Sequence, residues 1–254
     1  MPNGNTASDT RTRVYLVCNA RYHDTNYARL ELLKLLGEHE DIWTDVGASF
    51  SDVDTINSCK LLITYTCDLC PTPEEQVGLK RFLDGGGRWI ALHATNALLE
   101  FVNGKADTPD KAPGFMRMLG SRFVAHPPIQ KFLVEVAAPD HPLVAGIEPF
   151  EAEDEPYYCE YFGDNLVLLD AAYDTASNGY VRSTFGTDIA RHPQMYLHPA
   201  GAGEVLYLAL GHCCGKYDMR PLMNLAPVVR GTWEQPAYRE LLRRGIRWGM
   251  GALG

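Results

Sequence analysis

A short apolar segment that ends in a histidine constrains the fold of this chain most strongly. Residues 89–92 read Trp-Ile-Ala-Leu. Three consecutive glycines and Arg88 precede them, and His93 follows directly. Glycine allows a tight turn out of a preceding helix, and a continuous apolar run bounded by turn residues is typical of a buried strand. Residues 94–100 have the composition of a helix start. His93 is therefore predicted to lie at the carboxyl end of a strand, beside the first N–H groups of a helix.

Strand-like and helix-like segments alternate through the first half of the chain, which is typical of parallel strands joined by helical crossovers. The predicted strands cover residues 13–18, 41–46, 61–66 and 89–92, and the predicted helices cover residues 27–38 and 74–83. The first half therefore predicts an open, mostly parallel sheet.

The second half departs from this alternation. Residues 103–113 are polar and read as a loop or lid, and residues 115–119 read as a short helix. Half-exposed strands of an antiparallel extension are predicted at residues 132–136, 166–169 and 180–185, a last apolar strand at residues 205–210, and a closing amphipathic helix at residues 236–250.

The composition predicts one domain and a small ligand. The chain has 254 residues, of which 46% are hydrophobic, enough for a single α/β domain over residues 13–254 after a disordered polar lead over residues 1–12. A net charge of -9 without a Lys/Arg cluster argues against a nucleic-acid partner. Without a long apolar run or a signal-peptide pattern, we expect a cytoplasmic protein with no membrane partner. The sequence leaves open whether the protein forms a homo-oligomer.

Histidines follow three of the predicted strands at the point where each strand ends. His23, with Asp24 beside it, follows the first strand, and His93 and His212 follow two later ones. Ligands of open α/β sheets bind outside the carboxyl ends of the strands, so we expect these side chains to converge. Converging histidines form either a proton-transfer site or a metal site.

His126 and Glu155 are two further candidates. His126 follows the predicted lid, and Glu155 lies in the acidic and aromatic segment at residues 153–158. A carboxylate can orient a histidine or bind a sugar hydroxyl, and an aromatic ring such as Tyr157 can stack on the apolar face of a sugar. The alternative is a solvated acidic loop, and the residues themselves favour neither interpretation.

The cysteines and the absent motifs narrow the chemistry further. Seven scattered cysteines fit a reducing compartment, and the lone C-x-x-C at Cys67 and Cys70 favours an ordinary loop over a redox or metal site. A thiol-dependent hydrolase that uses Cys67 or Cys213 remains an alternative. No dinucleotide-binding, P-loop, G-x-S-x-G or H-E-x-x-H motif is present.

Several short motifs occur in a characteristic order. They are Gly85-Gly86-Gly87, Leu92-His93-Ala94-Thr95, His126-Pro127, Asp140-His141-Pro142, Asp154-Glu155-Pro156-Tyr157, the stretch from Gly203 to His212, and Gly245-Ile246-Arg247-Trp248. In this order and spacing, over residues 13–250, the chain resembles the ThuA-like family, named for trehalose utilisation. It departs from the family pattern at Tyr196, where a tryptophan is frequent, and at Cys213-Cys214 after the Gly-His pair.

The resemblance implies a flavodoxin-like, class I glutamine amidotransferase-like fold. This is a three-layer α/β/α sandwich with a mostly parallel central sheet and an antiparallel extension. Amidotransferases of this fold carry a nucleophilic cysteine where this chain has His93, so the resemblance excludes glutamine hydrolysis through a thioester. His212 resembles the histidine of the amidotransferase triad.

The resemblance also implies an enzyme of carbohydrate catabolism that acts on a sugar or an oxidised sugar derivative, by proton abstraction, isomerisation or hydrolysis. His93 and His212 are the expected acid and base, and Glu155 the group that orients one of them. The expected substrate-binding residues are His23, Asp24, His126, Tyr157 and Arg182. The sequence assigns no cofactor, but a divalent metal such as zinc would have His23, His93, His126 and His212 as its ligands. The alternative from another class is a non-catalytic sugar-binding or scaffold subunit that serves a partner oxidoreductase.

Overall fold

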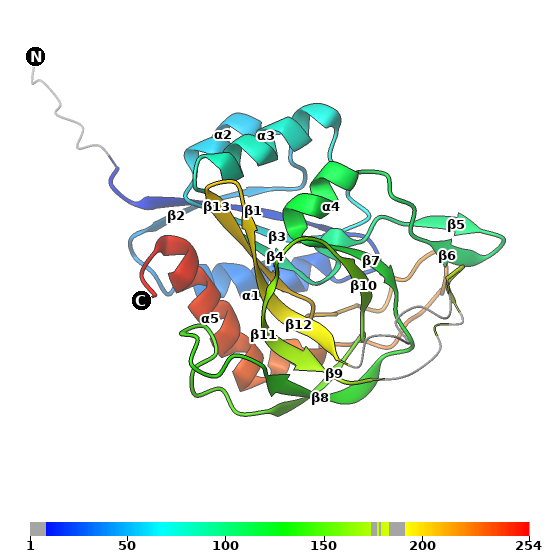
Figure 1. Cartoon of the computed structure of the whole chain (residues 1–254). Helices are drawn as coiled ribbons and strands as arrows, with labels where there is room; N and C mark the ends of the chain where they lie inside the picture. The colour runs from blue at the N-terminus through cyan, green and yellow to red at the C-terminus, as the bar shows by residue number, and fades with distance from the viewer. Residues whose placement is uncertain (1–8, 174–176, 178, 183–190, 254) are drawn as a thin grey trace, which may run out of the picture.

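One large sheet organises the molecule in the computed structural model, which describes residues 9–173, 177, 179–182 and 191–253 (Figure 1). Its nine strands have the order β2-β1-β3-β4-β13-β12-β11-β8-β9. The parallel strands are β1 (Thr12–Ala20), β2 (Ile42–Gly47), β3 (Leu61–Cys67), β4 (Arg88–Leu92) and β13 (Gly203–Leu208). The antiparallel strands are β12 (His192–Ala200), β11 (Leu166–Ala171), β8 (Gln130–Val136) and β9 (Phe150–Asp154).

The parallel strands alone have the order 2-1-3-4-5, one of the two common orders of doubly wound sheets. β13 pairs with β4 from Glu204 opposite Arg88 to Leu208 opposite Leu92. Because both strands end at this last pair, the residues that follow them lie side by side at the carboxyl edge of the sheet.

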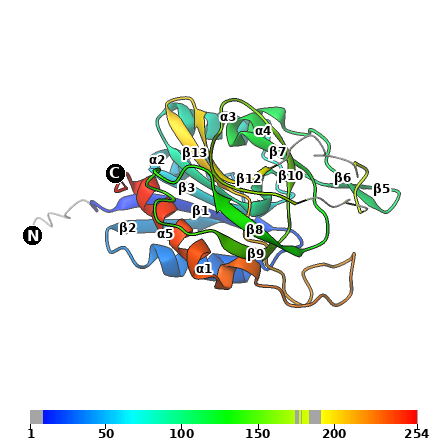
Figure 2. The same ribbon diagram turned by 60° about the horizontal axis from the view of Figure 1, so that its bottom comes forward.

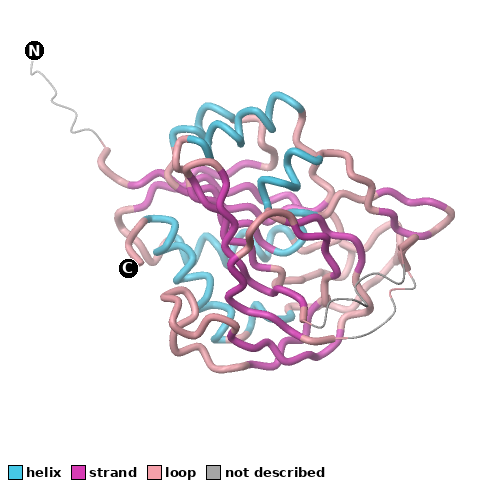
Figure 3. Tube along the Cα trace, viewed as in Figure 1, coloured by secondary structure: helices cyan, strands magenta, loops and turns pink. Residues whose placement is uncertain are grey.

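Helices cover both faces of the sheet and complete three layers (Figures 1 and 2). α1 (Thr25–Leu36) and α5 (Pro236–Met250) pack on one face, and α2 (Val53–Ser58), α3 (Pro73–Asp84) and α4 (Pro113–Leu119) pack on the other. Figure 3 shows the two helical layers on either side of the strands. All seven residues of β3 are buried, as expected for a strand covered on both faces. The predicted three-layer α/β/α sandwich is confirmed, with its parallel sheet and its antiparallel extension.

Most predicted elements agree with the structure to about two residues at each end, the usual uncertainty of helix and strand boundaries. The helix predicted over residues 94–100 is wrong. The chain forms only the 3-10 turn η1 (His93–Asn96), because Thr95 Oγ1 bonds to Leu92 O at 2.8 Å and Asn96 Nδ2 to Ser121 Oγ at 2.6 Å. Both side chains form hydrogen bonds in the core, so neither points into solvent as it would from the surface of a helix.

The segment predicted as a loop over residues 103–113 contains the turn and the second strand of a hairpin, which pairs β5 (Glu100–Val102) with β6 (Lys105–Asp107). Its turn is Asn103-Gly104, with φ of 51° and 78°, and two positive φ values are what a type I′ turn requires. Six further elements lie outside any prediction. They are α2, β9 and β12, together with β7 (Ser121–Ala125), its partner β10 (Tyr158–Tyr161) and the 3-10 turn η2 (Gly231–Glu234).

The antiparallel half differs from the predictions at two further points. His192 and Pro193 begin β12, a strand that the sequence does not predict. Of the strand expected at residues 180–185, Tyr180 forms one bridge with Ala106, and residues 183–185 lie outside the described residues. None of the described helices is both long and apolar enough to cross a membrane.

His192 provides a test of the buried sheet. Its ring is 1% exposed and stacks on Tyr173 with centroids 4.5 Å apart, and burial lowers its pKa to about 4. An unfolded histidine has a pKa of about 6.5, so the unfolded chain binds more protons between about pH 4 and 6.5, and stability falls as the pH falls through that window. Urea unfolding at about pH 7 and 5 should therefore show that the unfolding free energy falls less in His192→Phe than in the unsubstituted protein. The phenylalanine keeps a stacked ring but cannot be protonated. Equal losses in the two proteins would contradict this account.

Candidate active site and metal centre

His93 lies at a sharp turn at the carboxyl end of β4. Its φ is +47°, in the left-handed region that residues with a side chain rarely adopt. The turn is held by Tyr207, whose hydroxyl donates to the His93 carbonyl, and by Thr95, whose hydroxyl donates to Leu92 O. The side chain of His93 is completely buried. Strained conformations of this kind persist where the surrounding structure fixes them, and they are frequent at functional sites.

His212 reaches the same edge from β13. The preceding Gly211 has φ of +118°, and a Cβ there would lie 2.3 Å from the hydroxyl of Tyr238, so only glycine fits. Gly211 O accepts hydrogen bonds from Trp233 Nε1 at 2.7 Å and Tyr65 Oη at 2.9 Å. These contacts direct His212 back toward the end of β4.

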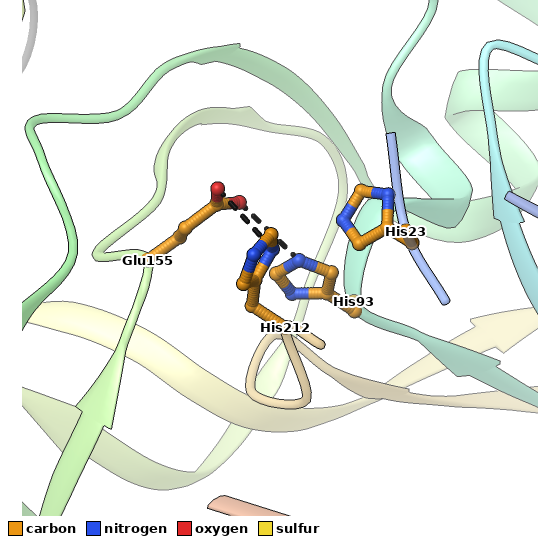
Figure 4. A group of neighbouring side chains, drawn as sticks. All are labelled: His23, His93, Glu155 and His212. Atoms are coloured by element: carbon orange, nitrogen blue, oxygen red, sulfur yellow. Dashed lines mark ion pairs between the residues drawn. The ribbon is translucent and has the colours of Figure 1, made fainter. Parts of the chain in front are cut away.

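His23, which follows β1, completes a group of three imidazoles. Its ring centroid lies 5.0 Å from that of His93 and 4.9 Å from that of His212. Glu155, which follows β9, adds a carboxylate (Figure 4). One ligand atom of each of these four residues lies within 4.8 Å of the others. The parallel strands thus supply the histidines, and the antiparallel half supplies the acid.

The Glu155 carboxylate contacts three imidazoles. Oε1 lies 3.2 Å from His212 Nδ1 and 3.5 Å from His126 Nε2, and Oε2 lies 3.4 Å from His93 Nε2. The His212 contact is an ion pair by distance but lacks hydrogen-bond geometry. Glu155 itself is 11% exposed at its side chain, so its charge is balanced by these neighbours more than by solvent.

Backbone carbonyls fix the tautomer of three histidines. The Nδ1 atoms of His23, His93 and His126 each lie 2.7 Å from a carbonyl oxygen, those of Arg21, Ala209 and Pro127 respectively. A carbonyl only accepts, so each Nδ1 carries the proton and each neutral ring keeps a lone pair on Nε2. Metal-binding histidines are oriented in the same way by their second nitrogen.

The neighbours of these Nε2 atoms show how well the site fits a cation. His93 Nε2 accepts from the Tyr157 hydroxyl at 3.0 Å. His23 Nε2 is buried and has no hydrogen-bond partner within the described part of the chain. A buried, unpartnered lone pair beside two further imidazoles and a carboxylate is what a divalent metal would satisfy, and three nitrogens with one oxygen suit zinc.

Burial and mutual charge set the protonation of the site. Burial lowers the pKa of His23 well below its usual value, and positive charge on His212 and His93 lowers it further. Burial also acts to lower the pKa of His212, but the Glu155 carboxylate outweighs it and raises this pKa to about 10. Burial alone would raise the pKa of Glu155, whereas His126 and His212 bring it well below its usual value. At neutral pH, Glu155 is therefore ionised, His212 protonated and His23 neutral.

Asp154 holds the acid and one histidine in place. Its completely buried carboxylate accepts from the backbone N–H groups of Gly211 at 2.8 Å, His212 at 3.0 Å and Glu155 at 2.8 Å, and from Thr232 Oγ1 at 2.6 Å. Two of these four donors belong to residues of the cluster. The same carboxylate thus joins the end of β9, the segment after β13 and the turn η2.

A cavity of about 270 Å³ opens onto the cluster. His23, His126, Glu155 and His212 form its polar part. The rest of its lining is mostly apolar and aromatic, and includes Tyr22, Phe101, Phe123, Tyr157 and Tyr180. A small ligand can therefore reach the histidines and the carboxylate together.

The structure brings together most residues that the sequence suggests. His23, His93, His212 and Glu155 form the cluster, and His126 and Tyr157 contact its members. Among the four expected metal ligands, His126 lies outside the tightest group. Glu155, expected to orient a histidine or to bind a hydroxyl, lies inside it.

Asp24 and Arg182 do not line the described cavity. Asp24 caps α1 by accepting from Tyr27 N at 3.1 Å, and it ion-pairs with Arg230 at 3.0 Å. Arg182 ion-pairs with Glu160 at 3.3 Å. The geometry gives neither residue a contact with the cluster, so a substrate-binding role for them remains a prediction.

The cysteines proposed as nucleophiles are buried. Burial raises the pKa of Cys67 well above its usual value and that of Cys213 to about 12. Both side chains are therefore neutral thiols at neutral pH, and a neutral thiol is a poor nucleophile. The environment of these residues does not favour a thiol-dependent hydrolase.

Sequence reasoning missed Asp154, Tyr22, Phe101 and Phe123. Asp154 directly precedes Glu155 in the acidic segment, but only the fold shows that one carboxylate points into the core and the other into the site. The Asn-Gly turn at residues 103–104 was a usable sequence indication of the hairpin that carries Phe101.

The fold and the site together define an α/β sandwich with a histidine and carboxylate cluster at the carboxyl edge of its parallel strands. The chain belongs to the ThuA family, described as trehalose utilisation, whose family model matches residues 13–226. No match was found among curated proteins.

Solved structures share the fold. A ThuA-like protein from Parabacteroides merdae superposes with a TM-score of 0.64 at 16% identity, over 96% of this chain and 91% of its own. A ThuA-like protein from Bacteroides uniformis gives 0.64 at 19% identity, over 98% and 94%. A cold-adapted β-galactosidase from Rahnella sp. R3 gives 0.60 at 16% identity, over 96% of this chain and 32% of its own. At these identities the similarity concerns the fold alone.

Substitution of Asp154 tests its part in the site. Asp154→Asn keeps the shape but removes the charge and points an amide donor at groups that are themselves donors, so we expect a loss of about 3 kcal/mol in unfolding free energy. Glu153→Gln is the matched control, because Glu153 is the exposed neighbour on β9. Urea unfolding of both variants measures the difference. Equal stability of Asp154→Asn and the unsubstituted protein would contradict this role.

Proposed function

We propose that this protein is a metal-dependent enzyme of carbohydrate catabolism that acts on a sugar or an oxidised sugar derivative. The metal is a divalent ion such as zinc, with His23, His93, His212 and Glu155 as its ligands. The observation that carries the proposal is the buried Nε2 of His23, which has no hydrogen-bond partner among the described residues. His23 belongs to a group of four residues whose ligand atoms lie within 4.8 Å of one another. The carbohydrate class is supported by the family description, trehalose utilisation.

The residues around the cluster divide the chemical tasks. A divalent metal at these donors supplies a Lewis acid that polarises a carbonyl or activates a water. His126 lies outside the ligand group, is 22% exposed at its side chain and contacts Glu155 through Nε2, so it is placed to exchange a proton with a ligand in the cavity. The Tyr157 hydroxyl, whose pKa burial raises well above its usual value, stays protonated. It donates to His93 Nε2 in this structure and would be released from that bond if His93 bound a metal through Nε2.

A second candidate is the same carbohydrate enzyme without a metal. The observation in its favour is the pair of His212 and Glu155, in which the raised pKa of His212 keeps this residue protonated at neutral pH. His212 would then act as the general acid and His93 as the base. Chelation separates the two candidates, because a metal-free acid–base enzyme keeps its activity in the presence of a chelator.

Metal binding is the first experiment. Protein without an affinity tag, equilibrated with zinc and then dialysed, should contain about one zinc per chain by elemental analysis. His93→Ala and Glu155→Gln should weaken zinc binding by at least about 100-fold, since loss of supporting residues around a metal already costs roughly 10- to 100-fold. His39→Ala is the control, because His39 follows the C-terminal end of α1 whereas His23 precedes its N-terminal end. Zinc content that His93→Ala leaves unchanged would contradict the metal site.

Zinc binding should also depend on pH. Because the pKa of His212 is about 10 before metal binds, zinc must displace a proton from this residue at neutral pH. The apparent dissociation constant should therefore rise about tenfold for each unit that the pH falls between about 8 and 7. Isothermal titration calorimetry in two buffers of different ionisation enthalpy would detect the released proton. Binding without proton release would be inconsistent with His212 as a ligand.

Turnover tests the enzyme against the non-catalytic alternative. Once a substrate is found, His93→Ala should abolish turnover while the protein remains folded by circular dichroism. A binding or scaffold subunit would show a change of affinity and no turnover in either protein.

A further inference from the structure

We infer that Tyr157 lowers the metal affinity of the cluster, because its hydroxyl occupies the one lone pair through which His93 can bind a cation. Tyr157 is then a positioning residue that acts through His93 and is not itself a ligand. The inference rests on the proposed function, and it predicts that removal of a single hydroxyl strengthens metal binding. Loss of a ligand or of a structural support would weaken metal binding instead.

His93 has a single nitrogen that can serve as a ligand. Its Nδ1 atom lies 2.7 Å from Ala209 O and carries the ring proton, because a carbonyl oxygen can only accept. Nε2 therefore holds the one lone pair of the neutral ring. The Tyr157 hydroxyl lies 3.0 Å from Nε2 and donates to this lone pair. One lone pair cannot accept that hydrogen and bind a cation at the same time, so the hydrogen bond and the metal compete for His93.

Packing holds the Tyr157 hydroxyl against His93. The Tyr157 ring is 3% exposed, and its centroid lies 4.5 Å from that of Phe123 and 4.7 Å from that of His93, on which it stacks. The Tyr173 hydroxyl donates to Tyr157 O at 2.8 Å and accepts from Gln194 Nε2 at 3.0 Å. The supporting residues belong to different parts of the sheet, with Phe123 in β7 and Gln194 in β12. The hydroxyl therefore keeps its position without any ligand in the cavity.

His23 has the opposite arrangement in the same cluster. Its Nδ1 atom is bonded to Arg21 O at 2.7 Å, but its Nε2 atom has no hydrogen-bond partner among the described residues. A cation bound at His23 replaces no hydrogen bond, whereas a cation bound at His93 replaces one. The hydrogen bond of Tyr157 to His93 is present only without metal, so it stabilises the metal-free state relative to the metal-bound state.

Other roles of Tyr157 predict a change of the opposite sign. If its oxygen bound the metal, or if its hydroxyl were needed to hold His93 in a ligating position, Tyr157→Phe would weaken metal binding. The same substitution keeps the ring that packs on Phe123 and removes only the hydroxyl. The direction in which zinc affinity changes therefore distinguishes competition from ligation or support.

Zinc affinity, measured at one pH by competition with a chromophoric chelator, tests the inference. Tyr157→Phe should bind zinc roughly five- to tenfold more tightly than the unsubstituted protein, the size expected for one hydrogen bond. Tyr15→Phe is the matched control, because Tyr15 is 5% exposed and packs in the core on the other face of the sheet. It should bind zinc like the unsubstituted protein, and circular dichroism checks that each variant is folded.

A double-substitution cycle tests whether Tyr157 acts through His93. In a His93→Ala background, Tyr157→Phe should leave the zinc affinity unchanged, because the hydroxyl then has no lone pair to occupy. Long-range proton–nitrogen NMR of the unsubstituted protein provides a measurement that needs no variant. The hydrogen bond from the Tyr157 hydroxyl to His93 Nε2 should be present without zinc and absent with zinc.

The outcomes separate the inference from the proposed function. If the unsubstituted protein binds zinc, then unchanged or weaker binding by Tyr157→Phe overturns the inference and leaves the proposed function standing. An equal gain in the His93→Ala background, or a hydrogen bond to His93 that persists with zinc, also overturns the inference alone. Zinc binding by Tyr157→Phe but not by the unsubstituted protein supports the inference and removes the metal from the proposed function. Zinc binding by neither protein overturns both.

Discussion

The buried carboxylate of Asp154 is the interaction on which the rest of the site depends. It accepts hydrogen bonds from Glu155 N in the antiparallel half of the sheet and from Gly211 N and His212 N in the parallel half. Its four hydrogen bonds satisfy three backbone N–H groups and one hydroxyl in a region from which water is excluded. The fold can therefore place an acid beside histidines that come from strands far apart in sequence.

The negative charge in the cluster can be neutralised by a proton or by a metal ion. Carbonyl oxygens fix the protons of His23, His93 and His126 on Nδ1, and the Nε2 atoms of His93 and His126 lie 3.4 and 3.5 Å from the carboxylate of Glu155. One negative charge among several imidazoles can be balanced either by a proton on His212 or by a divalent cation. The raised pKa of His212 corresponds to the protonated state. In the metal-bound state, His23 Nε2, which has no hydrogen-bond partner among the described residues, would gain one in the cation. The same geometry thus accounts for both candidate mechanisms.

Much of the fold and the centre of the site follow from the sequence. Apolar runs identify the parallel strands, and the rule that ligands bind at the carboxyl ends of strands selects His23, His93 and His212. The antiparallel half is harder to predict, because its strands alternate weakly and pair with partners distant in the chain. Asp154 and Glu155 are neighbouring acids that no local pattern separates. Likewise, nothing local to Tyr22 shows that its hydroxyl is buried, because its surroundings come from Asp68 and the hairpin that carries Phe101.

The central claim is that His23, His93, His212 and Glu155 together hold one divalent metal. A crystal structure of the zinc-equilibrated protein, with anomalous data collected on both sides of the zinc absorption edge, tests it most directly. The account predicts one anomalous peak bonded to the Nε2 atoms of His23 and His93, to a ring nitrogen of His212 and to a carboxylate oxygen of Glu155, at about 2.0 to 2.2 Å. A well-ordered site without a peak, or zinc bound only elsewhere on the protein, would contradict the claim.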